Sequence, residues 1–236
     1  MPIFPPNKSS RNMLLSKRLS AVAESLSPNT VVCDVGSDHG ALPLYLLKNN
    51  LCRKVFVSDL NLLPLKRAQK ALLDAGVSER AVFCHTDGIE SLLDFSLDVI
   101  VIAGMGGETI AGILSRAKKK IPVGMNFVFQ PMTKTVFLRQ YLYENGFLIT
   151  NEKLVKENKK IFLIIEAQYQ AKIVQKSDDA YLVGEYLPKV KNELTREYFQ
   201  QLLTKFNVKI LGKQKAGISC HQEEQYIAVI NAVMEE

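Results

Sequence analysis

Acidic side chains follow three short β-rich runs of the chain and could together bind a cationic ligand. Asp34 lies in the first run, and Asp59 and Asp87 end the next two. Because parallel strands of an open α/β sheet bind ligands at their carboxyl ends, we expect the three carboxylates to meet in one crevice. Asp59, 25 residues after Asp34, is placed to accept hydrogen bonds from ribose hydroxyls, and Asp87 could accept one from an adenine amino group. Aspartate is also common in turns, so each residue alone has a structural alternative.

The first run continues into the turn Gly36-Ser37-Asp38-His39-Gly40, which leads into a predicted helix. Glycine at the first position lets a ligand approach the backbone, and the helix start presents free N–H groups. The dinucleotide fingerprint is Gly-x-Gly-x-x-Gly, and its helix N-terminus favours a pyrophosphate. Here two aspartates accompany Gly-x-x-x-Gly, and they would repel a pyrophosphate but suit an ammonium and a sulfonium. The turn therefore favours S-adenosylmethionine and methyl transfer over hydride transfer, with a purely structural loop as the alternative.

Two further motifs follow the fourth and fifth β-rich runs. The segment Ala103-Gly104-Met105-Gly106-Gly107 places three glycines in four residues, which brings backbone close to a ligand or forms a strained turn. The sequence lacks here the Asn/Asp-Pro-Pro-aromatic tetrapeptide that methylases of exocyclic amines commonly carry. Gln130-Pro131 ends the fifth run, so we expect an amide side chain at the mouth of the crevice.

Residues 1–170 alternate β-rich runs with amphipathic stretches of helical length, the pattern of a parallel sheet with crossover helices. We expect Ser16 to cap a first helix. The predicted strands are 30–35, 54–58, 81–85, 97–103 and 126–130, and the predicted helices are 41–49, 62–75, 107–119 and 133–145. Runs 147–155 and 160–168 are separated by only four residues, too few for a parallel crossover, and must form an antiparallel hairpin. This order predicts an α/β, Rossmann-like, seven-stranded sheet of the class I methyltransferase type.

Residues 171–236 are predicted to form a separate, small, helical domain. Asp178 and Asp179 can open a helix, Pro188 can begin the next, and Gly212 and Gly217 would frame a turn before a last helix. We expect an antiparallel helical hairpin, and thus two domains, 1–170 and 171–236.

The charge of the chain is unevenly distributed. The net charge is +6, and the whole excess lies in residues 1–170, because residues 171–236 hold nine residues of each sign. A basic excess favours a polyanionic partner such as nucleic acid, although lysine runs are usually solvated faces. We expect no membrane span, because no run of about 18 uncharged apolar residues occurs. The basic cluster nearest the N-terminus includes Lys8 and Arg11.

Cysteine usage and the N-terminus bear on localisation. The four cysteines show no Cys-x-x-Cys pair and no histidine at ligand spacing, so neither a metal site nor a disulfide framework is expected. The N-terminus lacks the features of a signal peptide. These observations predict a cytoplasmic protein. The oligomeric state is not determined by the sequence, and a monomer is the working expectation.

The segments 34–43, 103–107 and 130–131, together with Leu15-Ser16-Lys17-Arg18-Leu19, resemble the bacterial tRNA adenine-N1 methyltransferases that act on position 22. The resemblance covers nearly the whole chain, including the C-terminal helices, a coiled-coil-like appendage in that family. The first dozen residues are additional. Two positions depart from the family pattern: Gly40 stands where alanine is usual, and Met132 stands where asparagine often follows Gln-Pro. These departures concern substrate contacts more than the cofactor site.

The resemblance implies S-adenosylmethionine as cofactor and tRNA as partner, and it assigns candidate roles to named residues. The cofactor contacts would be Asp34, Gly36, Ser37, Asp59, Leu60, Asp87, Gly88, Ala103 and Gly104. The substrate contacts would be Met105, Gly106, Gly107 and Pro131, and the catalytic candidates are Asp38, His39 and Gln130. Asp38 could stabilise the positive charge of the product base, whereas His39 could orient the base, transfer a proton or pack beneath the turn. Methylation of a small molecule or protein, and a non-catalytic tRNA-binding module, are the alternative functions.

Overall fold

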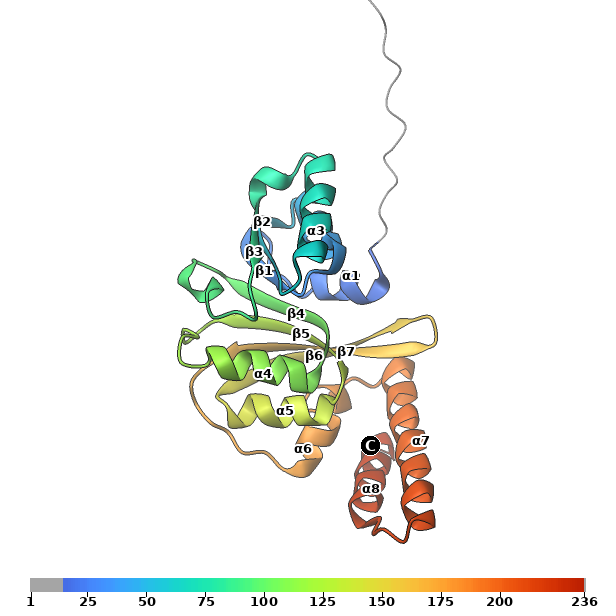
Figure 1. Cartoon of the computed structure of the whole chain (residues 1–236). Helices are drawn as coiled ribbons and strands as arrows, with labels where there is room; N and C mark the ends of the chain where they lie inside the picture. Colours follow the sequence, from blue (N-terminus) through green and yellow to red (C-terminus); the bar gives the residue numbers. More distant parts are fainter. Residues whose placement is uncertain (1–14, 236) are drawn as a thin grey trace, which may run out of the picture.

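The computed structural model describes residues 15–235, with Asp38 described by its backbone alone, and it contains one seven-stranded sheet (Figure 1). The strand order is β3-β2-β1-β4-β5-β7-β6, with β1 to β5 parallel and β7 antiparallel to both of its neighbours. The strands are β1 (Thr30–Val35), β2 (Cys52–Asp59), β3 (Ala81–His85), β4 (Val99–Gly106), β5 (Asn126–Thr133), β6 (Phe147–Glu157) and β7 (Lys160–Tyr169). The predicted fold class, including the terminal hairpin, is confirmed.

Helices cover both faces of the sheet, so successive residues of the central strands are buried on opposite sides. Val32 packs with Leu46 and Leu72, whereas Cys33 packs in the cluster that contains Leu114. This two-sided burial explains the continuous apolar runs of the parallel strands. The helices of the first face are α1 (Lys17–Ala23), α2 (Ala41–Lys48) and α3 (Leu62–Asp74), and those of the second are α4 (Gly107–Ala117) and α5 (Thr135–Glu144). The Leu19 amide donates to Ser16 Oγ at 3.3 Å, which confirms the predicted cap.

The hairpin of β6 and β7 reaches past the sheet at the edge where the parallel strands end. Phe129 of β5 pairs with Ile165 of β7, and β7 begins five residues earlier, at Lys160. Five residues of strand span about 17 Å. Figure 1 shows this projecting hairpin with α1 on one side and α7 on the other.

The C-terminal segment contains α6 (Asp178–Val183), the 3₁₀ turn Leu187–Lys189, α7 (Glu193–Lys215) and α8 (His221–Glu235). The predicted opening of a helix at Asp178 is confirmed, with Ser177 as its cap. Two other predictions are wrong. Pro188 lies within the 3₁₀ turn and begins no helix, because the next helix starts after the cap Asn192. Gly212 lies inside α7, where its backbone continues the helical hydrogen bonds. The turn before α8 contains Gly217, whose φ is +67°.

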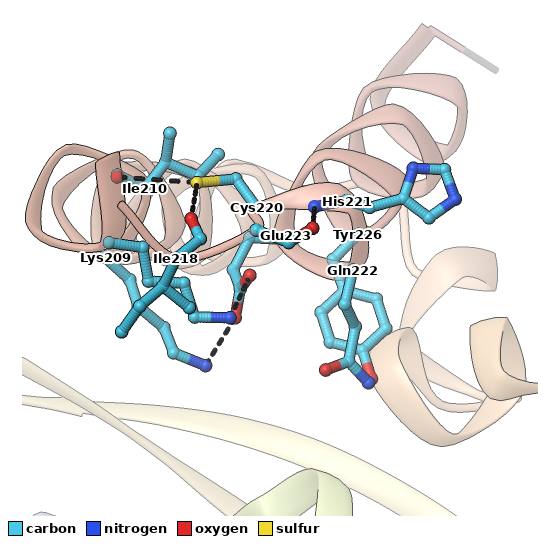
Figure 2. Close-up of polar contacts among 10 residues, drawn as sticks. Lys209, Ile210, Ile218, Cys220, His221, Gln222, Glu223 and Tyr226 are labelled. Atoms are coloured by element: carbon cyan, nitrogen blue, oxygen red, sulfur yellow. Dashed lines mark hydrogen bonds and ion pairs between the residues drawn. The ribbon is translucent and has the colours of Figure 1, made fainter. Parts of the chain in front are cut away.

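Helices α7 and α8 form the predicted antiparallel hairpin, and a buried carboxylate joins them. Glu223 of α8 lies between Lys209 and Lys213 of α7, with both N–O distances 2.6 Å (Figure 2). The hydrogen bonds from these lysines, Lys209 first, lower the pKa of Glu223 to about 2. The ring centroids of Phe206 and Tyr226 lie 5.3 Å apart. One ion cluster and one aromatic contact thus fix the register of the two helices.

Helix α6 packs on α5 and the sheet, not on this hairpin alone. Arg139 of α5 is fully buried and donates to Glu152 Oε1 of β6 at 2.6 Å and to the carbonyls of Tyr181 and Leu182 at 3.2 and 2.8 Å. Tyr181 and Leu182 belong to the core of the sheet domain. The domain division after residue 170 stays a prediction.

Candidate functional site

Gly36 and Gly40 shape the turn after β1, each for a different structural reason. The amides of Gly36 and Ser37 both donate to the Ser58 carbonyl, at 2.8 and 3.2 Å, so the turn is fastened to the end of β2. Gly36 has φ +74°, and a Cβ there would overlap the end of the Met105 side chain. Gly40, with φ +69°, brings α3 close, because a Cβ would lie 2.8 Å from that of Ala68. Gly36 thus opens backbone toward the strand ends, while Gly40 allows close helix packing.

A cavity of about 660 Å³ lies at the carboxyl ends of β1, β2 and β3, along one side of α4. It brings together six residues predicted from the sequence: Gly36, Asp59, Leu60, Asp87, Gly88 and Met105. Its walls also include Ser58, Asn61, Glu108 and Arg116, none of which was predicted. Asp34, Ser37, Ala103 and Gly104 do not line it. The convergence of strand-end residues expected from topology is therefore present for the second and third acids.

The two predicted aspartates that line the cavity are each held by one carboxylate oxygen. Asp59 Oδ1 accepts from the Asn61 amide at 2.7 Å, and Asp87 Oδ1 accepts from Arg116 Nη2 at 2.9 Å. The Ser58 hydroxyl is buried in the cavity wall, and its oxygen has no hydrogen-bond partner within residues 15–235. Each carboxylate thus retains a second oxygen, and Ser58 a hydroxyl, for a polar ligand.

Asp34 does not line the cavity, and the pKa of its carboxyl group is raised. Its side chain is buried, and this burial raises its pKa to about 6. The nearby Ser37 hydroxyl opposes the shift, while the negative charge of Asp59 adds to it. A ligand cation near these acids would stabilise the ionised form of Asp34.

Gln130 is fully buried, and both ends of its amide contact protein groups. Its Oε1 accepts from Arg18 Nη1 at 2.5 Å and from the Gly104 amide at 3.2 Å, and its Nε2 donates to the Pro131 carbonyl at 3.0 Å. This arrangement joins α1 to the ends of β4 and β5. It favours a positioning role, and the catalytic role stays a prediction. Arg18 lies in the segment 15–19 that carries the resemblance, but the sequence assigns it no site role, because its partner lies 112 residues away.

The remaining candidates lie around the same turn and loop. His39 is exposed and has φ +59° within the 3₁₀ turn Asp38–Gly40. The backbone of Asp38 starts that turn directly after Ser37. Gly107 is buried at the start of α4, where a Cβ would lie 2.5 Å from the Lys134 carbonyl oxygen, so packing requires a glycine here, and its substrate contact stays a prediction. Gly106 and Met105 are half-buried beside it.

The described residues form neither a metal-binding cluster nor a membrane-spanning helix. Within residues 15–235, no group of three or more histidine, cysteine or acidic side chains is arranged to hold a metal ion. In the same part of the chain, no helix is long and apolar enough to cross a membrane. The predicted basic residues Lys8 and Arg11, and the additional N-terminal dozen residues, lie outside the described part.

The strand order, with β7 inserted antiparallel beside β5, and the acid-lined cavity define a Rossmann-like methyltransferase fold. A family model described as a methyltransferase domain matches residues 15–165. The tRNA (adenine(22)-N(1))-methyltransferase of Bacillus subtilis is 30% identical over 198 residues, which are 80% of this chain and 81% of that protein. The chain belongs to this family of tRNA methyltransferases.

Two solved structures extend the similarity to the whole fold. A Streptococcus pneumoniae protein in complex with S-adenosyl-L-methionine is 26% identical, with a TM-score of 0.81 over 94% of this chain and 100% of that one. The M. capricolum protein TrmK, in complex with the cofactor product S-adenosyl-homocysteine, is 25% identical, with a TM-score of 0.74 over 92% of this chain and 99% of that one. Both alignments extend beyond the methyltransferase domain into the C-terminal helices.

Proposed function

We propose that the chain transfers a methyl group from S-adenosylmethionine to N1 of adenine at position 22 of tRNA. The observation that carries this proposal is the cavity at the strand ends, which holds Asp59 and Asp87 in a chain 30% identical to the B. subtilis enzyme. Carboxylates at these strand ends suit a cofactor with an ammonium and a sulfonium group and no phosphate. The proposal places the protein in the cytoplasm, where its tRNA would be.

The residues of the cavity fit this cofactor. Asp59 has an oxygen left for ribose hydroxyls, Asp87 has one for the adenine amino group, and the unpartnered hydroxyl of Ser58 lies on the same wall. The Gly36 turn presents backbone without a Cβ. When bound, S-adenosylmethionine supplies an electrophilic methyl group. Further proposed contacts are Leu60 and Gly88 in the cavity, with Asp34, Ser37, Ala103 and Gly104 around it.

The chemistry required of the protein is alignment and charge stabilisation. Adenine N1 carries an in-plane lone pair and no proton, so attack on a methyl group needs no general base. The product base is cationic, and a carboxylate close to it would stabilise the developing charge. Asp38, which begins the turn after Ser37, is the proposed source of that carboxylate. His39 would orient the base, and Met105, Gly106, Gly107 and Pro131 would form the rim of the adenine pocket.

Position 22 lies within a folded tRNA, so the base has to leave its stack to enter the crevice. The ordered link from Arg18 through Gln130 to Gly104 would hold the rim of the crevice in shape while the base enters. This makes Gln130 a positioning residue in the proposed mechanism.

The test uses methyl-labelled S-adenosylmethionine and an unmodified tRNA transcript, with the same transcript carrying G22 as the matched control. We expect labelled 1-methyladenosine after digestion of the A22 transcript and none from the G22 transcript. Label in another nucleoside, in protein or in a small molecule would replace the proposed substrate. Binding of tRNA without any methyl transfer would indicate a non-catalytic module.

A further inference from the structure

We propose that one surface beside the crevice binds the RNA strand that flanks the target nucleotide. We call it the α1–hairpin face, and it is formed by Lys17, Arg18, Lys159, Lys160 and Phe162. The inference rests on the proposed function, because it assigns a place to the tRNA that this function requires. The occupant we infer is the phosphodiester backbone of the substrate, with one base against the aromatic ring.

The α1–hairpin face lies at the same edge of the sheet as the cavity. Strand β7 runs antiparallel to β5, so the start of β7 lies beyond the carboxyl end of β5. Lys160 begins β7 and Lys159 precedes it in the turn. The tip of the hairpin therefore projects from the sheet at the carboxyl ends of the parallel strands, where the cavity also lies (Figure 1).

Arg18 joins this hairpin to the rim of the crevice. Its Nη1 donates to Gln130 Oε1, which also accepts from the Gly104 amide, and its guanidinium carbon lies 5.8 Å from the centre of the Phe162 ring. Phe162 is half-buried and lies on the α1 side of β7, two residues before Ile164, which belongs to the α1-side core. A stacked arginine and ring next to a crevice is a surface suited to a nucleotide, because both groups have planar faces on which a base can stack.

The lysines of the α1–hairpin face lack the ion pairs that neighbouring lysines of the hairpin form. Lys17, Lys159 and Lys160 are exposed, and none of them forms an ion pair with a carboxylate in the described chain. Lys153 and Lys156 of the same hairpin are instead paired, with Glu166 and Glu197. The nearest acid along the strands is Glu157, opposite Lys160 in the register. Cations without a protein carboxylate at one end of the crevice favour an anionic strand there.

The experiment compares Lys159→Glu/Lys160→Glu with Lys48→Glu/Lys119→Glu. The control lysines are also exposed. Lys48 is the last residue of α2 and Lys119 follows the end of α4, so both lie at the opposite edge of the sheet. We expect the hairpin variant to raise the KM for tRNA about tenfold or more and to reduce the salt dependence of tRNA binding by about two phosphate contacts. The control variant should stay within about threefold of the wild type. The dissociation constant for S-adenosylmethionine should change less than twofold in both.

If the wild type methylates A22 and the two double variants have the same KM for tRNA, the α1–hairpin face is refuted. The proposed function then still stands. A wild type that transfers no methyl group to tRNA would overturn the proposed function, and absence of tRNA binding as well would remove both. Equal melting temperatures show that the variants are folded, and Lys159→Gln/Lys160→Gln replaces the hairpin variant if it is not. A loss of tRNA affinity in Phe162→Leu, which keeps an apolar side chain, would support the stacking contact, whereas unchanged affinity would overturn it.

Discussion

Asp34→Asn should change how the stability of the protein depends on pH. Burial raises the pKa of Asp34 from 3.8 to about 6, so the folded protein holds a proton there between these values and the unfolded chain does not. The free energy of unfolding therefore falls as the pH rises from 3.8 to 6. The difference between the two pKa values, at 1.36 kcal/mol per pH unit, makes the wild type about 3 kcal/mol less stable above pH 6 than it is well below pH 3.8. The asparagine variant lacks this cost.

Urea denaturation of the cofactor-free protein from pH 4 to 7.5 measures this effect. The unfolding free energy of the wild type should fall relative to Asp34→Asn by about 2.4 kcal/mol across that range, because the rest of the total effect lies below pH 4. Asp94→Asn serves as the control, because Asp94 is exposed and, among residues 15–235, forms an ion pair only with Lys120, 3.9 Å away. It should follow the wild type. Parallel curves for wild type and Asp34→Asn would refute the inference that Asp34 is protonated in the folded cofactor-free protein at pH 5.

Asp34 should also make the cofactor affinity depend on pH, and this affinity should rise with pH while the stability falls. A cation bound near Asp34 stabilises the carboxylate, so the affinity for S-adenosylmethionine in the wild type should rise as the pH passes through 6. Calorimetric titration should show a flat profile in Asp34→Asn. A wild-type affinity that does not change between pH 5 and 7 would contradict this coupling.

Three other substitutions test separate parts of the structure. Arg139→Met should lower the unfolding free energy by about 3–5 kcal/mol in urea, because it leaves Glu152 buried without its partner, and the double variant with Glu152→Leu should recover most of the loss. Asp38→Ala should keep the cofactor affinity within a few-fold but lower the single-turnover transfer rate by orders of magnitude, and an unchanged rate would remove Asp38 from the mechanism. Arg18→Lys keeps the charge but not the geometry of the hydrogen bond to Gln130, so kcat should fall about tenfold with the cofactor affinity unchanged, and equal loss of cofactor affinity would assign Arg18 a different role.

The elements that carry the site could be predicted because each has a local signal. The strand that ends in Asp59 and the turn that begins at Gly36 follow from apolar runs and glycine positions within a few residues. Parallel topology then brings their ends to one edge, so the cavity containing Asp59 and Asp87 could be expected without coordinates.

Other features depend on contacts between distant residues and have no local signal. Arg18 meets Gln130 across 112 residues, and Arg139 meets Leu182 across 43. Gly212 was misjudged because a glycine in an exposed helix costs only about 1 kcal/mol, which the rest of a 23-residue helix readily offsets. The position of Asp34 at the strand end could be predicted from the sequence. Its burial could not, because burial depends on how distant elements pack.

The insertion of β7 between β5 and β6 has a consequence for how the chain is made. Until residue 169 leaves the ribosome, β5 is an uncovered edge of the nascent sheet, with its backbone amides and carbonyls open to other chains. Strands β6 and β7 can pair with each other first and then close that edge as a preformed unit. Fragments that stop between α5 and β7 should therefore aggregate during synthesis, even though they contain every residue of the acid-lined cavity.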